Sequence, residues 1–200
     1  MKKNNFTYRK ACASDDVTAI AKYVYMTDPF IYPNMCDDYA DPFFIRLISH
    51  CIKEKTNLFY YDNIFVALHN EKIIGVLCGV CCGTKLTFIE NLNLSDKEHR
   101  RLELTNNGYF IPLINESLSL SGYNITNVCI DSDFRHQGIG ENLVNFYLSQ
   151  IPKEIVHLDV IADNSSAIRL YKRCGFEIES KYYGFSGKEE NLLCYHMVKK

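Results

Sequence analysis

Two periods of apolar residues mark the second half of the chain. Between 155 and 161 every second residue is apolar, at Val156, Leu158 and Val160. A period of two predicts a half-buried strand. Between 139 and 150 the apolar residues recur every three or four positions, at Ile139, Leu143, Phe146 and Tyr147. That spacing makes one stripe, so this segment is predicted to be an amphipathic helix.

A second helix is predicted directly after the strand at 155–161. Asp163 or Asn164 supplies a side-chain oxygen that can cap its first turn. Gly175 follows at the position where a left-handed residue commonly ends a helix. Between these signals the apolar residues that share one face are Ala167, Leu170 and Tyr171. The segment between the cap and Gly175 is therefore predicted to be helical.

The first half of the chain predicts three strands and two helices. Residues 6–11 alternate as an edge strand does, and Ser-Asp-Asp at 14–16 marks the start of a helix. Asp-Pro at 41–42 opens a second, short helix whose apolar residues are Phe43, Leu47, Ile48 and Cys51. Residues 64–80 read as a hairpin around the turn His-Asn-Glu-Lys. A further strand is predicted at 125–130.

The chain is predicted to end with two strands, near 176–183 and 192–198, joined by a loop that contains Gly184 and Gly187. The full order of elements gives a mixed α/β sheet with helices on both faces. Two hundred residues without a repeat or linker suit a single domain over 1–200. An insert at about 84–124 separates the hairpin from the next strand. It carries a capping box, Ser95 with Glu98, and a second predicted helix at 111–120.

Composition narrows the class of partner. The net charge is −2 and the pI is near 6.3, with no long block of lysine or arginine, which argues against nucleic acid. No run of about 18 apolar residues occurs, so no membrane span is expected. The first ten residues lack the apolar stretch of a signal peptide. We therefore expect a cytoplasmic protein with no membrane partner.

The chain has nine cysteines, an odd number, and most lie in apolar runs. Free, reduced and mostly buried thiols fit best. Cys78, Cys81 and Cys82 invite comparison with a zinc site, but on a strand Cys81 points away from the other two. No second pair of cysteines or histidines completes four ligands, so no metal is expected.

The strand at 125–130 leads into a turn that can hold an anion. Arg-His-Gln-Gly-Ile-Gly at 135–140 opens a helix whose first N–H groups and dipole favour a phosphate. A dinucleotide fingerprint needs a glycine at 143, where leucine stands, and no Walker-type loop occurs. The turn at 135–140 thus has the form R-x-x-G-x-G.

This R-x-x-G-x-G turn resembles the pyrophosphate-binding motif of the GNAT superfamily of acyl-CoA-dependent N-acetyltransferases. The later string N-x-x-A-x-x-L-Y-x-x-x-G-F, which begins at Asn164, resembles the second signature of the family. Together the two motifs lie within residues 125–176, about a quarter of the chain. The resemblance implies a mostly antiparallel central sheet of about seven strands. It also implies that the strands at 125–130 and 155–161 splay apart around the cofactor.

The resemblance implies acetyl-CoA as co-substrate. Backbone groups of the strand and of the turn would hold it, together with Asn164 and Tyr171. The residues implied in this binding are Val128, Cys129, Ile130, Arg135, His136, Gln137, Gly138, Ile139, Gly140, Glu141, Asn164 and Tyr171. The sequence departs from the family pattern at His136 and Gln137, which replace the commoner glycine and lysine or arginine, and at Ser132, where proline is frequent. Oxyanion donors are expected from the N–H groups near Cys129 and Ile130.

Two side chains are implied in catalysis. Tyr171 matches the tyrosine that in many GNAT enzymes protonates the departing sulfur. Asp159, twelve residues earlier, matches an acidic residue that accepts the amine proton in some N-terminal-amine acetyltransferases. His157 shares its strand face, and Glu90 or Asp28 are further candidates for the base. An exposed Asp159 without a role is the competing interpretation.

The sequence therefore predicts transfer of an acetyl group to a primary amine, by direct attack in a ternary complex. A non-catalytic acyl-CoA-binding or regulatory module is the alternative, and a structural protein whose turn is only a turn is the third. The acceptor stays open: the aromatic segment 27–62 and the insert would shape its pocket, and acidic residues between 28 and 41 could favour a cation. A homodimer, common in the superfamily, also stays open.

Overall fold

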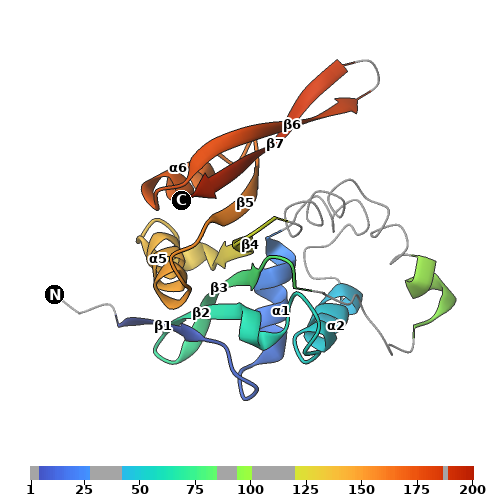
Figure 1. Cartoon of the computed structure of the whole chain (residues 1–200). Coiled ribbons are helices and arrows are strands. Elements are labelled where there is room, and N and C mark those ends of the chain that lie inside the picture. The colour runs from blue at the N-terminus through green and yellow to red at the C-terminus, as the bar shows by residue number, and fades with distance from the viewer. Residues whose placement is uncertain (1–4, 28–41, 85–93, 101–119, 187–188) are drawn as a thin grey trace.

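The computed structural model describes residues 5–27, 42–84, 94–100, 120–186 and 189–200 (Figure 1). Seven strands form one sheet in the order β1-β2-β3-β4-β5-β7-β6. Their bounds are β1 Phe6–Lys10, β2 Ile64–His69, β3 Lys72–Cys81, β4 Tyr123–Ile130, β5 Val156–Ile161, β6 Glu177–Ser186 and β7 Glu189–Lys199. Only β4 and β5 pair in parallel; the other described neighbours are antiparallel. This confirms the predicted mixed, mostly antiparallel sheet.

Helices cover both faces of the sheet, as predicted (Figure 1). The described helices are α1 Val17–Met26, α2 Pro42–Cys51, α5 Ile139–Gln150 and α6 Ser165–Arg173, with 3-10 turns η2 Tyr61–Asn63 and η3 Ser132–Phe134. One core lies between the sheet and the pair α1 and α2, and the other lies beneath α5 and α6. The apolar stripe of α5 faces this second core, with Leu143 and Tyr147 almost fully buried.

Local signals explain where the first elements begin and end. Among the candidates at 14–16, Asp16 caps α1, because its carboxylate accepts from the N–H groups of Thr18 and Ala19 at 3.0 and 3.1 Å. The turn between β2 and β3 places Asn70 and Glu71 at φ 49° and 65°. Two successive left-handed residues match the twist of a tight hairpin. The predicted hairpin at 64–80 is therefore confirmed.

The middle of the sheet is open on one side. β4 pairs with β5 only over Tyr123–Ile125, opposite Val156–Leu158. On its other edge β4 pairs with β3 until the register shifts, and Thr126 is the extra residue of a bulge between partners Ile125 and Asn127. Beyond the bulge β4 and β5 diverge. The splayed strands that the resemblance implied are thus present.

Some boundaries differ from the sequence predictions. β4 begins at Tyr123, two residues early, and β3 ends at Cys81, so the segment that separates them is 82–122 rather than 84–124. The final hairpin is longer than predicted, and Gly184 pairs with Asn191 inside it rather than lying in the loop. Strand pairing across the hairpin outweighs the low strand preference of glycine. Gly187 and residues 111–119 of the helix predicted at 111–120 lie outside the described residues.

The described part of the insert contacts α2. Ser95 and Glu98 form the predicted capping box, with Ser95 N–H donating to Glu98 at 2.9 Å, and residues 96–100 are helical. Glu98 also forms an ion pair with Arg46 of α2. Leu94 packs on the core beneath α1 and α2. These contacts hold residues 94–100 against the α2 side of the sheet.

Candidate active site

A row of free backbone donors lies where β4 passes into α5. Gly138 caps α5 with φ 77°, and His136 also has a positive φ of 61°. Within the described chain, the N–H groups of residues 136–141 donate to no protein acceptor; the first bond of the helix runs from Asn142 to Gly138. Such donors, together with the helix dipole, favour an anion at this position.

Side chains of the turn support this backbone. Arg135 donates from Nε to the carbonyl oxygen of Ile130 at 3.0 Å, which holds the turn against the end of β4. Gln137 reaches back to the carbonyl oxygen of Asp133 at 3.5 Å. Glu141 accepts from Nε of Arg173, on α6, at 2.7 Å. The turn therefore offers backbone donors to a ligand while its long side chains hold the loop in place.

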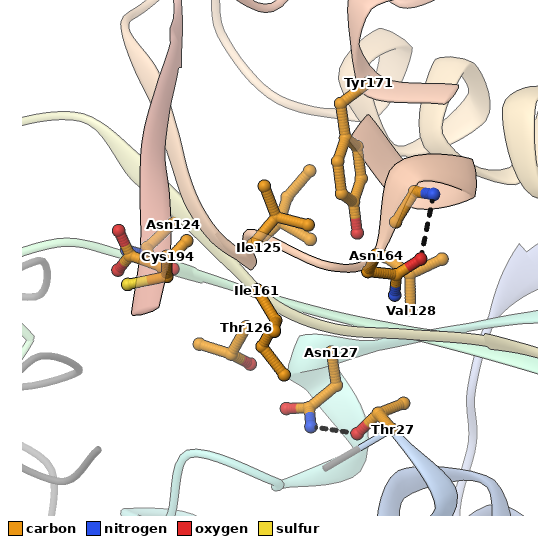
Figure 2. A pocket seen from close by; sticks show the side chains of 13 residues that line it. Thr27, Asn124, Ile125, Thr126, Asn127, Val128, Ile161, Asn164, Tyr171 and Cys194 are labelled. Carbon is orange, nitrogen blue, oxygen red and sulfur yellow. Dashed lines mark hydrogen bonds between the residues drawn. The ribbon is translucent and has the colours of Figure 1, made fainter. Parts of the chain in front are cut away.

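A groove of about 390 Å³ runs over this turn between β4, α5 and α6. Most residues implied in cofactor binding line it: Val128, Cys129, Ile130, Arg135, His136, Gly138, Ile139, Gly140, Glu141, Asn164 and Tyr171. Gln137 is not among the lining residues. Asn164 caps α6, as its Oδ1 accepts from Ala167 N–H at 3.1 Å, and its amide nitrogen lies on the side of Val128 (Figure 2).

A smaller cavity of about 140 Å³ continues the groove into the gap between β4 and β5. Asp159 and Tyr171, the two residues implied in catalysis, both line it. The groove and the cavity share five residues, which are Thr27, Val128, Asn164, Ala167 and Tyr171. A molecule seated at the turn can therefore extend without interruption to the Asp159 carboxylate.

Tyr171 lies on the buried face of α6, with 8% of its surface exposed. Its ring packs edge-on against Phe176, 5.9 Å between centroids, and its hydroxyl points toward the cavity (Figure 2). Burial raises the pKa of the Tyr171 phenol above its ordinary value of 10.0, and Cys174 raises it further. The side chain therefore stays protonated at neutral pH, as an acid must.

Asp159 is not the exposed strand-end carboxylate of the competing interpretation. Its side chain is 21% exposed and its Oδ1 lies 2.8 Å from Nδ1 of His196, the residue directly opposite on β7. His157, the other candidate on this strand, is buried against His196 and does not line the cavity. Glu90 and Asp28 lie outside the described residues. Among the described candidates, Asp159 alone faces the cavity.

Alternation along β4 decides which backbone groups face the gap. The N–H of Asp131 bonds to Ile74 on β3 at 2.8 Å, and the carbonyl of Ile130 accepts from Arg135 on the opposite side. Backbone groups reverse direction at each residue of a strand. The N–H groups of Ile130 and Val128 therefore face the gap, and that of Cys129 faces β3. The Cys129 side chain is packed in the α1 side of the core, and burial raises its pKa to about 11.

The structure adds polar residues that the sequence did not single out. Asn127 donates from its amide to the hydroxyl of Thr27 at the end of α1, across the mouth of the cavity (Figure 2). Thr126, at the bulge, lines the cavity with a buried hydroxyl that has no partner among the described residues. Arg173, two residues after Tyr171, places a cation in the groove. Its position inside the second motif, between Tyr171 and Gly175, was the one signal available from sequence.

No group of three or more histidine, cysteine or acidic side chains within the described ranges is placed to hold a metal ion. The eight described cysteines are free thiols, of which Cys12 and Cys81 are exposed. None of the helices in the described segments is long and apolar enough to cross a membrane.

Comparison with known proteins decides the family. Residues 32–176 match the model of the acetyltransferase (GNAT) family, which spans more than half of the chain. The chain belongs to the GNAT family. Acetyl transfer from acetyl-CoA is the activity of this family, so the GNAT protein described here is an acetyltransferase that uses acetyl-CoA.

Individual relatives are distant. The GNAT chain is 28% identical over 114 residues to the [ribosomal protein bS18]-alanine N-acetyltransferase of Escherichia coli, covering 54% of this chain and 75% of that one. It is 31% identical over 74 residues to an uncharacterised protein of Mycobacterium leprae, covering 36% of this chain and only 21% of that longer protein. An N-acetyltransferase structure from Staphylococcus aureus shares the fold, with a TM-score of 0.67 at 20% identity and coverage of 96% and 99%.

The groove fits coenzyme A on its own geometry. The free N–H groups of residues 136–141 suit a pyrophosphate, and Gly138 leaves open space above them, because a Cβ there would meet no atom within 4 Å. The continuation between β4 and β5 suits a slender arm that ends in a thioester. Bound there, acetyl-CoA supplies the activated acyl group.

Proposed function

We propose that this GNAT protein acetylates a primary amine by direct attack within a ternary complex, with Tyr171 as acid and Asp159 as base. One observation carries the proposal: the phenol and the carboxylate line the same small cavity, at the inner end of the groove that begins at the anion site. An acid for the leaving group and a base for the nucleophile are what acyl transfer from a thioester requires.

Tyr171 acts on the leaving group. A thiolate of pKa near ~8.5 leaves more readily when a proton is delivered to it. The hydroxyl of Tyr171 holds that proton, because burial keeps its pKa above the ordinary value. Tyr171 lines both the groove and the inner cavity, which supports this role.

Asp159 acts on the nucleophile. An ammonium ion has no lone pair, so the amine must lose a proton before it attacks. For a lysine-like amine of pKa ~10.4 that costs roughly 4 to 5 kcal/mol at pH 7, whereas an α-amine of pKa near ~8 costs only about 1 kcal/mol. A single carboxylate can more easily offset the smaller free-energy cost of deprotonating an α-amine. The N–H groups of Ile130 and Val128 face the gap and are the proposed donors to the developing oxyanion.

We propose a peptide or protein N-terminus as the acceptor. The lower cost of removing a proton from an α-amine supports this choice. The name of the Escherichia coli relative, which acetylates an alanine of a ribosomal protein, also supports it. Polyamines, amino acids and aminoglycosides are the competing acceptors. The next experiment is a thiol-release screen that offers all four classes with acetyl-CoA.

The alternative is a non-catalytic module that binds acyl-CoA on the same fold. Isothermal titration with acetyl-CoA, run beside the thiol-release screen, separates the two. An enzyme binds acetyl-CoA and releases thiol only when its acceptor is present, and Asp159→Asn lowers that rate. Binding without thiol release for any acceptor would favour the module, and absence of binding would overturn both.

A further inference from the structure

Asp159 is the first member of a line of contacts that leads from the cavity into the protein. Its Oδ1 lies 2.8 Å from Nδ1 of His196, and Nε2 of His196 lies 3.2 Å from Nδ1 of His157. Nε2 of His157 then lies 3.0 Å from the carbonyl oxygen of Ser121, just before β4. Both histidines are buried, 3% and 6% exposed, so water does not replace these contacts.

With both histidines neutral and Asp159 ionised, this line of contacts has one proton too few to form all three hydrogen bonds. A carbonyl oxygen only accepts, so the proton of a neutral His157 must lie on Nε2, facing Ser121. Nδ1 of His157 is then an acceptor, and the proton of a neutral His196 must lie on Nε2. That arrangement leaves the bare Nδ1 of His196 facing a carboxylate that also only accepts. One additional proton is needed to complete all three hydrogen bonds.

The additional proton belongs at the Asp159 end. Burial lowers the pKa of His157, which keeps that ring neutral. His196 is buried as well, but its Nδ1 lies 2.8 Å from a carboxylate, and that contact favours its charged form. The neighbouring groups are Cys194 on β7, Tyr182 and Glu179 on β6, and Asn124 on β4. Burial raises the pKa of the Cys194 thiol to about 12, so this thiol stays neutral. The charge of Glu179 affects the pKa of His157 less than burial and the Ser121 contact do.

We propose that His196 is a positioning residue that shares one proton with Asp159, so that Asp159, His196 and His157 work as a single base. The inference rests on the proposed function, in which Asp159 accepts the proton of the amine. The N–H bond of the ammonium breaks, its electron pair stays on nitrogen, and the proton enters the line between Asp159 and His196. The total charge of Asp159, His196 and His157 changes from −1 to 0, and the added proton completes the hydrogen bonds between them.

The arrangement changes the strength of the base. An isolated aspartate has a pKa near ~3.9 and binds an amine proton weakly, whereas an imidazole beside a carboxylate has a pKa above ~6.5. The form without the shared proton is the active one, so activity falls as the pH drops through the apparent pKa of the Asp159–His196 pair. We expect the acidic limb of kcat/KM above pH ~6.5 rather than near pH ~4.

The shared proton is observable without catalysis. In ¹⁵N NMR of the full chain, His196 should gain one proton with a midpoint above pH ~6.5, while His157 keeps its single proton on Nε2. Asp159→Asn should lower the His196 midpoint by more than one pH unit. A His196 that stays neutral down to pH 5 in the unsubstituted protein would overturn the proposal. The exposed His99 is the internal reference, and His99→Asn should leave both signals unchanged.

The rate experiment uses His196→Asn, because an asparagine amide still donates to Asp159 and does not titrate. We expect the acidic limb of kcat/KM to move down by about two pH units and the rate at neutral pH to fall. An unchanged limb would overturn the proposal, and His99→Asn is the matched control. If His196→Asn does not fold, the NMR titration with Asp159→Asn decides alone. If no acceptor is acetylated, the proposed function fails while the NMR result still reports on the shared proton.

Discussion

The hydroxyl of Tyr23, in α1, donates to Oδ2 of Asp131, the residue that follows β4, at 2.7 Å. The other carboxylate oxygen of Asp131 accepts from the N–H of Asp133 and caps η3. One carboxylate thus joins α1 to the entrance of the anion-binding turn. The hydrogen bond from Tyr23 is the main reason that the pKa of Asp131 lies below its ordinary value of 3.8.

Tyr23→Phe should destabilise the protein by about 1 kcal/mol at pH 7, since it removes a hydrogen bond to a charged group that is partly solvated. The lowered pKa of Asp131 means that this contribution is present above pH ~4 and lost as the carboxylate is protonated below it. Urea unfolding at pH 7 and pH 3 measures both parts. If Tyr23→Phe lowered the free energy of unfolding equally at pH 7 and at pH 3, a role of the charged Asp131 would be contradicted.

Gly138→Ala should weaken acetyl-CoA binding roughly tenfold, or ~1.4 kcal/mol, and cost about 1 kcal/mol in stability. The added Cβ meets no atom, but φ 77° is strained for alanine, and relief of that strain turns the N–H groups away. Gly83→Ala is the control, because Gly83 has the same φ of 77° and equally open space outside the groove. Calorimetry should find its affinity unchanged with a similar loss of stability.

Tyr171→Phe should lower kcat by about 10² or more and leave the Kd of acetyl-CoA nearly unchanged, because the ring still fills its place and only the proton is lost. Its raised pKa also predicts that the unsubstituted enzyme does not lose this acid below pH ~10. The matched variant is Tyr147→Phe, since Tyr147 is buried in the same core and its hydroxyl has no partner among the described residues. Equal kcat values for the two variants would remove Tyr171 from the chemistry.

Glu141→Gln should tighten acetyl-CoA binding two- to fivefold at low salt. The substitution removes a negative charge from the groove and frees Arg173 to face the phosphates. The effect should fade as salt is raised, because the site is partly exposed. The free energy of unfolding should change by less than ~1 kcal/mol, as expected for an exposed pair. Weaker binding at low salt would instead mean that Glu141 positions Arg173.

The sequence predicted elements best where the signal is local. The stripe of α5, the cap at Asn164 and the end of α6 at Gly175, with φ 88°, were all predicted, because each depends on residues within one or two turns. The resemblance implied Tyr171 and Asp159 as partners in one site, and both line the same cavity. Their spacing along the chain fixes their spacing across one strand and one helix.

Contacts between distant segments were not predictable in this way. His196 meets Asp159 because β7 pairs with β5 and leaves β6 at the edge, an order that no local pattern encodes. The bulge at Thr126 depends on how β3 and β4 align, and both strands read as regular from their own residues. The partial burial of Asp159 beside His196 therefore follows from the topology, and the interpretation of an exposed strand-end carboxylate was wrong about its exposure.

The divergence of β4 and β5 decides where in the sheet unpaired backbone groups lie. Beyond Ile125, β4 presents unpaired backbone groups in the middle of a sheet rather than at its margin. Such a row at an outer margin invites a strand from another molecule and starts aggregation. Here residues of α1, α6 and β5 line the gap beside it. The unpaired groups of β4 are thus placed inside the sheet, where a slender ligand in the gap could bond to them, and not at an outer strand.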